Sequence, residues 1–163
     1  MSNKINGKSP AQSVVESRYL VMPGDANHYG TAFGGAIVSW IDMVASMSAQ
    51  KHAGKEAVTA SIDTITFREP IKIGDHVVLR ALVTYVGKTS MEIEVDVSKE
   101  DVSSGNRALA TTANLTFVAL DKNKQPTEVP QLVPETTEDR QRFQRAQMRV
   151  QSRKELRAKM KEL

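Results

Sequence analysis

The chain has 163 residues, of which 40% are hydrophobic and 25% are charged, and its formal net charge at pH 7 is +3. A chain of this size is typical of one domain that buries roughly 68–70% of its unfolded surface. The composition excludes collagen-like, low-complexity and disordered proteins. Because the sequence contains no cysteine, it excludes disulfides, thiolate metal sites and a cysteine nucleophile, and it suits a reducing compartment.

Residues 1–12 are polar and lack the apolar core of a secretory signal, so we expect a flexible tail on a cytoplasmic protein. Beyond this tail, segments rich in β-branched residues predict strands, joined by turns too short for a crossover helix, which indicates a mainly antiparallel sheet. Residues 91–97 alternate between apolar and acidic side chains, which predicts one buried and one solvent-exposed face. The predicted strands cover residues 13–21, 58–67, 77–86, 91–100 and 107–120.

Residues 32–50 predict a helix in which Asp42 is the only charged residue. Apolar side chains recur at helical spacing and cover the helix nearly all round, so we expect it to be buried. Two glycines, three serines and a central aspartate argue against insertion into a membrane. One strand, one apolar helix and then four strands predict the α+β class, with a curved sheet wrapped around a single central helix.

Residues 138–163 carry most of the positive charge, with 9 Lys/Arg against 4 Asp/Glu. Thr136 is positioned to cap a helix here, with acidic residues in its first turn and lysines in its last. Its apolar residues form no full stripe, so we expect a peripheral basic helix. It presents either a solvated charged face or a site for a phosphate-bearing ligand or a partner subunit. A nucleic-acid site is poorly supported, since Phe143 is the only aromatic ring in this segment.

Several catalytic motifs are absent from the sequence, including a nucleophile elbow, a Walker loop and a dinucleotide-binding glycine motif. Its three histidines, at positions 28, 52 and 76, lack the spacing of a helical metal site, so we expect no metal. Gly34 and Gly35 open the apolar helix, where unpaired backbone N–H groups can bind a developing oxyanion. The alternative interpretation of these glycines is a tight turn with close packing of the helix on the sheet.

Asp42 is the second candidate for chemistry. Burial of a carboxylate is costly, and it raises the pKa towards values suited to a general base. Alternatively, Asp42 is a polar residue bonded to a partner chain. It lies seven residues after Gly35, about 10 Å along the helix axis, which is too far for both groups to act on the same reacting atoms. A dimer can bring them together across its interface.

Five motifs in a fixed order resemble the hotdog-fold acyl-CoA thioesterases of the bacterial acyl-CoA hydrolase group. This resemblance implies a hotdog domain over residues 13–125, followed by a linker and the basic helix over residues 126–163. It also implies a homo-oligomer, at least a dimer and often a hexamer built from three dimers, with each site between subunits. The motifs are D-A-N-x-x-G-x-x-F-G-G at 25–35, W-I-D at 40–42, F-x-x-P-x-x-x-G-D at 67–75, G-K-T-S-M at 87–91 and T-F-V-A-L-D at 116–121.

The resemblance further implies hydrolysis of acyl-CoA to free fatty acid and CoA, with no cofactor. Asn27 of one subunit would hold the thioester or the attacking water. Asp42 of the other would act as general base or nucleophile, and the Gly35 N–H would polarise the carbonyl. Gly34 and Phe33 are expected beside the substrate, although core packing is the alternative for Phe33, as it is for Trp40, Met43 and Met47.

The phosphates of CoA have their own candidate ligands. Lys88, Thr89 and Ser90 match the family segment near bound CoA, and Arg107 or the basic C-terminal helix is expected to contact the phosphates. Two other functions remain open. One is a hotdog dehydratase of hydroxyacyl thioesters, which would use a histidine such as His28. The other is a non-enzymatic acyl-CoA sensor or scaffold, which would bind acyl-CoA and leave it intact.

Overall fold

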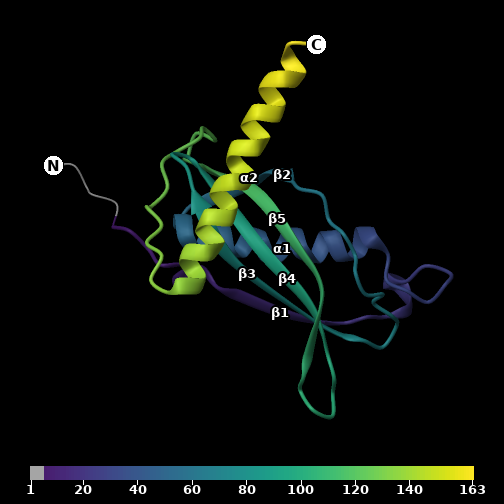
Figure 1. Ribbon diagram of the computed structural model, residues 1–163. Coiled ribbons are helices and arrows are strands. Elements are labelled where there is room, and N and C mark those ends of the chain that lie inside the picture. The colour runs from purple at the N-terminus through teal and green to yellow at the C-terminus, as the bar shows by residue number, and fades with distance from the viewer. Residues whose placement is uncertain (1–5) are drawn as a thin grey trace.

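A five-stranded antiparallel sheet forms the centre of the computed structural model, which describes residues 6–163, and its strand order is β1-β3-β4-β5-β2. Helix α1 lies against one face of the curled sheet and α2 crosses the other (Figure 1). The expected α+β class and the sheet wrapped around a central helix are therefore confirmed. The elements are β1 (Val15–Leu20), α1 (Gly34–Ala53), β2 (Glu56–Ile62), β3 (His76–Val86), β4 (Ser90–Glu100), β5 (Arg107–Leu120) and α2 (Thr137–Lys161).

The stripe of α1 that faces the sheet is fully buried, as its spacing predicts. Ile41 and Val44 are 0% exposed and pack with the inward residues of β3, β4 and β5 in one core. Side chains of this size contribute about 1.5–3 kcal/mol each when fully buried. Gly54 ends the helix in the left-handed conformation, with φ of 64°, which glycine adopts at low cost.

The opposite face of α1 is open, so the expectation of a helix buried all round is wrong for that face in the single chain. Met43 is 49% exposed and Met47 is 44% exposed, and Ser39 beside them is also exposed. The reason is geometric, because the sheet covers one side of the helix only. Trp40 belongs to the covered side, where it is 7% exposed and its ring stacks on Tyr19 at 4.8 Å.

Both faces of β4 are covered, so the prediction that one face of this strand is exposed to solvent is wrong. Glu92 and Glu94 are only 1% and 6% exposed because α2 lies over them. Arg149 and Arg153 each contact a different oxygen of Glu92 at 2.6 Å, and Arg142 contacts Glu94 at 3.0 Å. The alternation in the sequence thus marks a charge-lined interface between the sheet and a helix.

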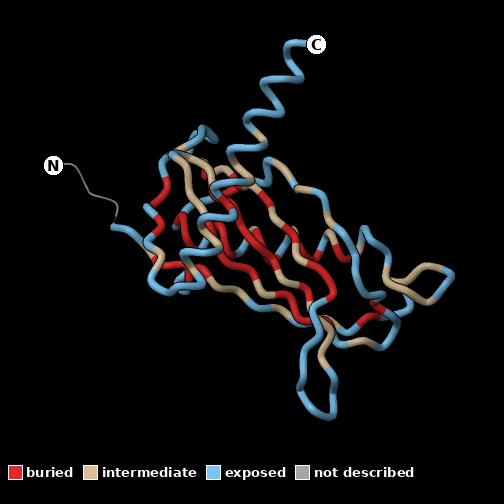
Figure 2. Tube along the Cα trace, viewed as in Figure 1, coloured by how far each residue is buried: buried red, intermediate tan, exposed pale blue. Residues whose placement is uncertain are grey.

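The basic helix begins where its cap was predicted, since the Thr136 side chain accepts a hydrogen bond from the Asp139 N–H. Its arginines on the sheet side are partly buried, so the solvated-face interpretation fails for that stripe. The last part of α2 projects beyond the sheet and is exposed (Figures 1 and 2). Within residues 6–163, no helix has the length and apolar character needed to cross a membrane.

The described part of the expected N-terminal tail is held in place. Lys8 pairs with Leu132 through its backbone, and its ammonium donates to the carbonyls of Lys51 and His52 at the end of α1. A cation at a helix C-terminus is favourable because the helix dipole is negative there. Residues 1–5 of the tail lie outside the described residues.

The predicted strand at 58–67 is too long, because β2 ends at Ile62. Asp63 leaves the edge of the sheet, and its carboxylate accepts from Arg153 of α2 at 2.6 Å. The other predicted strands agree with the observed ones to within two residues at each end.

The carboxylate of Glu92 is expected to be necessary for stability. Glu92→Gln removes the negative charge that Arg149 and Arg153 share, and loss of one partner from a buried ion pair costs about 3–5 kcal/mol. Urea unfolding followed by circular dichroism should show this loss. Glu162→Gln, at an exposed position near the end of α2, is the control and should stay within about 0.5 kcal/mol of wild type. Equal unfolding free energies for the two variants would contradict the prediction.

Stability should also fall at mildly acidic pH because of His52, which is fully buried. Its Nε2 lies 2.9 Å from the Pro130 carbonyl, which fixes Nε2–H as the donor. Burial lowers the pKa of His52, the Pro130 contact opposes that shift, and nearby Lys8 adds to it. The folded state therefore binds fewer protons than the unfolded state below about pH 6.5. The contribution of neutral His52 to stability is fully present above that pH and is lost as the pH falls.

The measurement is the urea midpoint at a series of pH values from neutral to mildly acidic. His52→Gln should flatten the decline on the acidic side, whereas His28→Gln, at an exposed histidine, should leave it unchanged. A decline that persists in full in His52→Gln would assign it to other groups.

Candidate active site

Asp42 lies in the middle of α1 and is joined to the edge strand β2. The Thr59 hydroxyl donates a hydrogen bond of 2.7 Å to Asp42 Oδ1. In the single chain Asp42 is half-buried and Thr59 is exposed. Oδ1 is thereby fixed, and Oδ2 has no hydrogen-bond partner within residues 6–163.

Sequence reasoning missed Thr59, because only the register of β2 places it beside α1. The register of β2 against β5 shifts between Thr59 and Ser61, which marks a β-bulge. Bulges redirect side chains and are frequent beside active sites. The sequence offers no local signal for this bulge, which follows from the pairing of two segments far apart in the chain.

Asn27 lies in the loop before α1 and organises that loop. Its side-chain oxygen accepts from the backbone N–H groups of Tyr29 and Thr31 at 3.0 and 3.3 Å, and its amide nitrogen donates to the Thr31 hydroxyl at 2.9 Å. The Asp25 carbonyl accepts from the Phe33 N–H at 2.8 Å, which ties the same loop to the start of α1. Asn27 and the first turn of α1 therefore lie together.

The first turn of α1 exposes backbone N–H groups. Its N-cap residue, Phe33, makes no side-chain cap, and the first N–H groups of a helix have no intrahelical acceptor. A Cβ on Gly35 would meet no atom within 4 Å, and one on Gly34 would meet only the Phe67 ring, at 3.8 Å. Close packing within residues 6–163 therefore does not explain the two glycines, and their N–H groups are open to approach.

A small cavity of about 170 Å³ lies beside this first turn. Its lining is mainly apolar, with the Phe67 ring and Ile71 opposite Gly34. Phe33 is 50% exposed at the same end of the helix and does not belong to the core. The helix terminus thus combines hydrogen-bond donors with apolar surface, as binding of a ligand with one polar and one apolar part requires.

Within a single chain, the candidate residues form two groups that lie apart. Asn27 and Gly35 lie at the start of α1, whereas Asp42 and Thr59 lie about 10 Å further along its axis. A reacting carbonyl must lie about 3 Å from both the oxyanion donor and the attacking group. Within one chain, the two groups are therefore too far apart to act on the same carbonyl.

The candidate phosphate ligands are also split. Lys88, Thr89 and Ser90 lie at one end of β4, while Arg107 lies opposite Glu100 at its other end. The strand has 11 residues, so more than about 30 Å separates its ends. The structure therefore does not bring Arg107 together with the other three.

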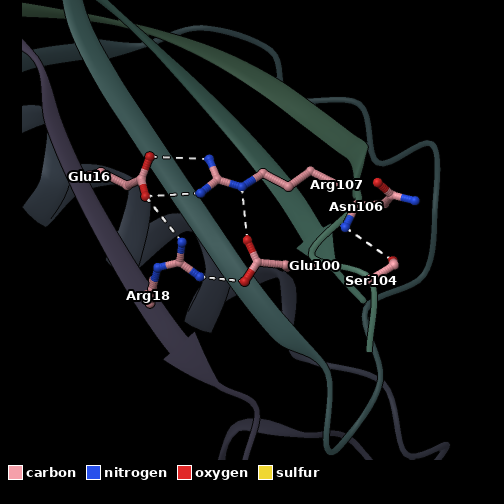
Figure 3. A network of polar contacts seen from close by, with 6 residues as sticks. All are labelled: Glu16, Arg18, Glu100, Ser104, Asn106 and Arg107. Atoms are coloured by element: carbon pink, nitrogen blue, oxygen red, sulfur yellow. Dashed lines mark hydrogen bonds and ion pairs between the residues drawn. The ribbon is translucent and has the colours of Figure 1, made fainter. Parts of the chain in front are cut away.

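Arg107 belongs to a network of ion pairs (Figure 3). Its guanidinium contacts Glu16 at 3.1 Å and Glu100 at 3.0 Å, and these two carboxylates raise its pKa further. Arg18 and Arg107 in turn lower the pKa of Glu100. Contact of Arg107 with CoA phosphates stays a prediction. No cluster of three potential metal ligands occurs within residues 6–163.

Comparison with known proteins identifies the family. The thioesterase superfamily matches residues 29–105. The uncharacterised acyl-CoA thioester hydrolase YkhA of Bacillus subtilis is 46% identical over 143 residues, which cover 88% of this chain and 83% of YkhA. The cytosolic acyl coenzyme A thioester hydrolase of Rattus norvegicus is 38% identical over 128 residues, 77% of this chain but 34% of that protein.

Solved structures agree. The acyl-CoA hydrolase of Staphylococcus aureus, solved with butyryl coenzyme A, coenzyme A and coenzyme A disulfide, matches with a TM-score of 0.90 and 40% identity over 95% of this chain and 94% of its own. An apo-hexameric acyl-CoA thioesterase matches with a TM-score of 0.89 and 39% identity over 94% of this chain and 99% of its own. This chain belongs to the thioesterase superfamily and has the hotdog fold. Within that superfamily it is an acyl-CoA thioester hydrolase.

Three solved variants of the Staphylococcus aureus enzyme bear on the site. In them an asparagine, an aspartate and a threonine are each replaced by alanine. These positions are 15 and then 17 residues apart in that protein, which is the spacing of Asn27, Asp42 and Thr59 here.

The open N-terminus of α1 predicts a specific response to Gly35→Ala. The added methyl group meets no atom of the chain, so stability should be unchanged or slightly higher, since alanine favours a helix by about 1 kcal/mol over glycine. The methyl group would obstruct approach of a ligand to the N–H, and loss of one oxyanion donor costs about 10²–10³ in kcat. Release of CoA thiol and thermal unfolding measure the two effects. An unchanged kcat would refute an oxyanion role for this N–H group.

Proposed function

We propose that acyl-CoA is hydrolysed at a site shared by two copies of this chain. One copy supplies Asn27 and the Gly35 N–H, and the other supplies Asp42 with Thr59. The observation that carries this proposal is the separation of about 10 Å between the two half-sites along α1, which no side-chain movement within one chain can close.

The surface around Asp42 supports this assembly. Strand β2 is an edge of the sheet, and edge strands offer unpaired backbone groups to another chain. Val58 and Ile62 on β2 are 43% and 40% exposed, and Met43 and Met47 on α1 are 49% and 44% exposed. The chain is proposed to form at least a dimer, and a hexamer of three dimers by similarity to the hexameric relative. Similarity to the cytosolic rat enzyme favours a cytoplasmic location for this chain.

The chemistry follows from the two halves. The Gly35 N–H donates to the thioester carbonyl oxygen, where negative charge develops. Asp42 Oδ2 either takes a proton from water, whose oxygen then bonds to the carbonyl carbon, or attacks that carbon itself to form an anhydride that water hydrolyses. In either case the C–S bond breaks, CoA leaves as the thiolate and takes up a proton. The Thr59 hydroxyl holds Asp42 Oδ1 throughout, so Oδ2 keeps its orientation.

The rest of the substrate is assigned to the surroundings of the site. Phe33, Gly34 and the cavity beside Phe67 are proposed to contact the acyl end. Lys88, Thr89 and Ser90 are proposed to contact the CoA end. No cofactor takes part in this scheme, because a thioester is already activated for acyl transfer.

Thiol release from a panel of acyl-CoAs of increasing chain length tests this function. The chain has no cysteine, so a thiol-reactive dye reports only the CoA released. Asp42→Asn should lower kcat by about 10² or more, and Thr59→Val by about tenfold because one orienting hydrogen bond is lost. Thr64→Val, at an exposed threonine outside the site, is the control. Binding of acyl-CoA without release by wild type would instead support a sensor.

Mixing two inactive variants tests the shared site. Asn27→Ala and Asp42→Asn are unfolded together and refolded in equal amounts. In a mixed dimer with sites between subunits, one site carries both substitutions and the other carries neither, so about a quarter of wild-type activity should return. If both residues act within one chain, no site in the mixture is intact and activity stays absent.

A further inference from the structure

Helix α2 is longer than the sheet that it crosses. Arg153 contacts Asp63, the residue after β2, at 2.6 Å, and one turn later Arg157 lines a cavity with Ser61 of β2. Because β2 is the edge of the sheet, the helix reaches that edge here and then projects past it (Figures 1 and 2). Its last six residues, 156–161, form an overhang. They extend about 9 Å, roughly twice the spacing of neighbouring strands, so the overhang is long enough to cover another strand.

The side of α2 that faces the sheet changes from charged to apolar at the overhang. Over the sheet this side carries Arg149 and Arg153, which both contact Glu92. Leu156 and Met160 follow these two arginines by seven residues each, which is nearly two full helical turns, so they continue the same side. They are 60% and 66% exposed. An apolar pair therefore faces the direction in which the sheet would continue beyond β2.

Strand β2 carries an exposed apolar side chain on the same outer face. Its residue Ala57 belongs to the core on the α1 side, so the next residue, Val58, points to the side that α2 crosses. Val58 is 43% exposed. It lies near the beginning of β2, whereas α2 passes Ser61 near the end of the strand. The helix of the same chain therefore leaves Val58 uncovered.

Pairing of two copies through β2 would bring these two apolar surfaces together. Identical edge strands that pair about a twofold axis perpendicular to the sheet run antiparallel, and their outer faces stay on the same side. The end of one β2 then lies beside the beginning of the other. The overhang of one copy leaves its own sheet at the end of β2, so it comes to lie over the beginning of the partner's β2.

We propose that the overhang of α2 docks on a second copy of this chain, where Leu156 and Met160 pack against Val58 of the partner subunit. This contact rests on the dimer of the proposed function and adds an interaction that strand pairing alone does not require. Burial of the three apolar side chains favours it. Twofold symmetry repeats the contact, so each dimer contains it twice.

An anionic lipid surface is the other partner that suits a basic helix with an apolar side. The strength of such binding scales with the apolar area that enters the lipid. The sheet-facing side of the overhang offers only Leu156 and Met160 for this purpose. Two side chains are a small area for a membrane but match the single valine on β2, so the second copy is the better occupant.

Directed cross-linking tests the contact, because the chain has no cysteine of its own. Under mild oxidation Val58→Cys/Met160→Cys should give disulfide-linked dimers on a non-reducing denaturing gel. The matched control is Val58→Cys/Met148→Cys. Met148 is 71% exposed on the same helix but lines a cavity with Tyr85 of β3, far from the β2 edge. The control should cross-link no more than Val58→Cys alone, and equal cross-linking by the two double variants would overturn the proposal.

Dissociation on dilution, followed by mass photometry, gives a second measurement. Met160→Gln should raise the concentration at which monomers appear by about tenfold, because two contacts are lost from each dimer. Met148→Gln should leave that concentration within about twofold of wild type. An unchanged value for Met160→Gln, or binding of wild type to phosphatidylserine vesicles that Met160→Gln abolishes, would overturn the proposal.

The outcomes separate this contact from the proposed function. A wild-type chain that stays monomeric and still hydrolyses acyl-CoA would refute the shared site together with the docked overhang. A dimeric wild type whose Val58→Cys/Met160→Cys variant forms no linked dimers would refute the docked overhang alone.

Discussion

The packing of α1 into the curled sheet is the constraint on which the rest of the structure depends. Ile41 and Val44 of α1 are completely buried against three strands of the sheet. Such close packing fixes both the position and the rotation of the helix. Its rotation points Asp42 towards β2, and its position leaves the N–H groups of Gly34 and Gly35 uncovered. The site therefore follows from hydrophobic packing, although none of its reacting groups is hydrophobic.

The outer face of the sheet is covered in a different way. Arginines of α2 meet Glu92 and Glu94 where apolar residues would usually lie. Buried ion pairs often contribute little net stability compared with an apolar contact, yet they are costly to break. A charged interface also fixes the position of α2 along the sheet, because each arginine must meet its own carboxylate. This position places Lys154 and Arg157 around the same cavity as Ser90 and Thr116 of the sheet.

Local patterns in the sequence were sufficient to predict most of the elements and part of the candidate site. Helical spacing located α1, its glycines and Asp42, and the capping pattern located the start of α2. The failures concern contacts between distant segments. The acidic positions of β4 were expected in water because nothing in residues 91–97 shows that α2 lies over them. The ion pair of Arg107 with Glu16 was not predicted, because the two residues lie 91 positions apart in the chain. Thr59 was missed for the same reason.

The bulge in β2 connects the two faces of the sheet. In a regular strand Thr59 and Ser61 would point to the same side, but the register shift pairs Thr59 with the core residue Phe117 and Ser61 with the outward residue Thr116. Thr59 therefore contacts Asp42 on the α1 side, while Ser61 lines the cavity on the α2 side. One edge strand thus borders both the carboxylate proposed for hydrolysis and the interface between the sheet and α2. The strand that is proposed to join two subunits therefore also fixes the orientation of the proposed reacting group.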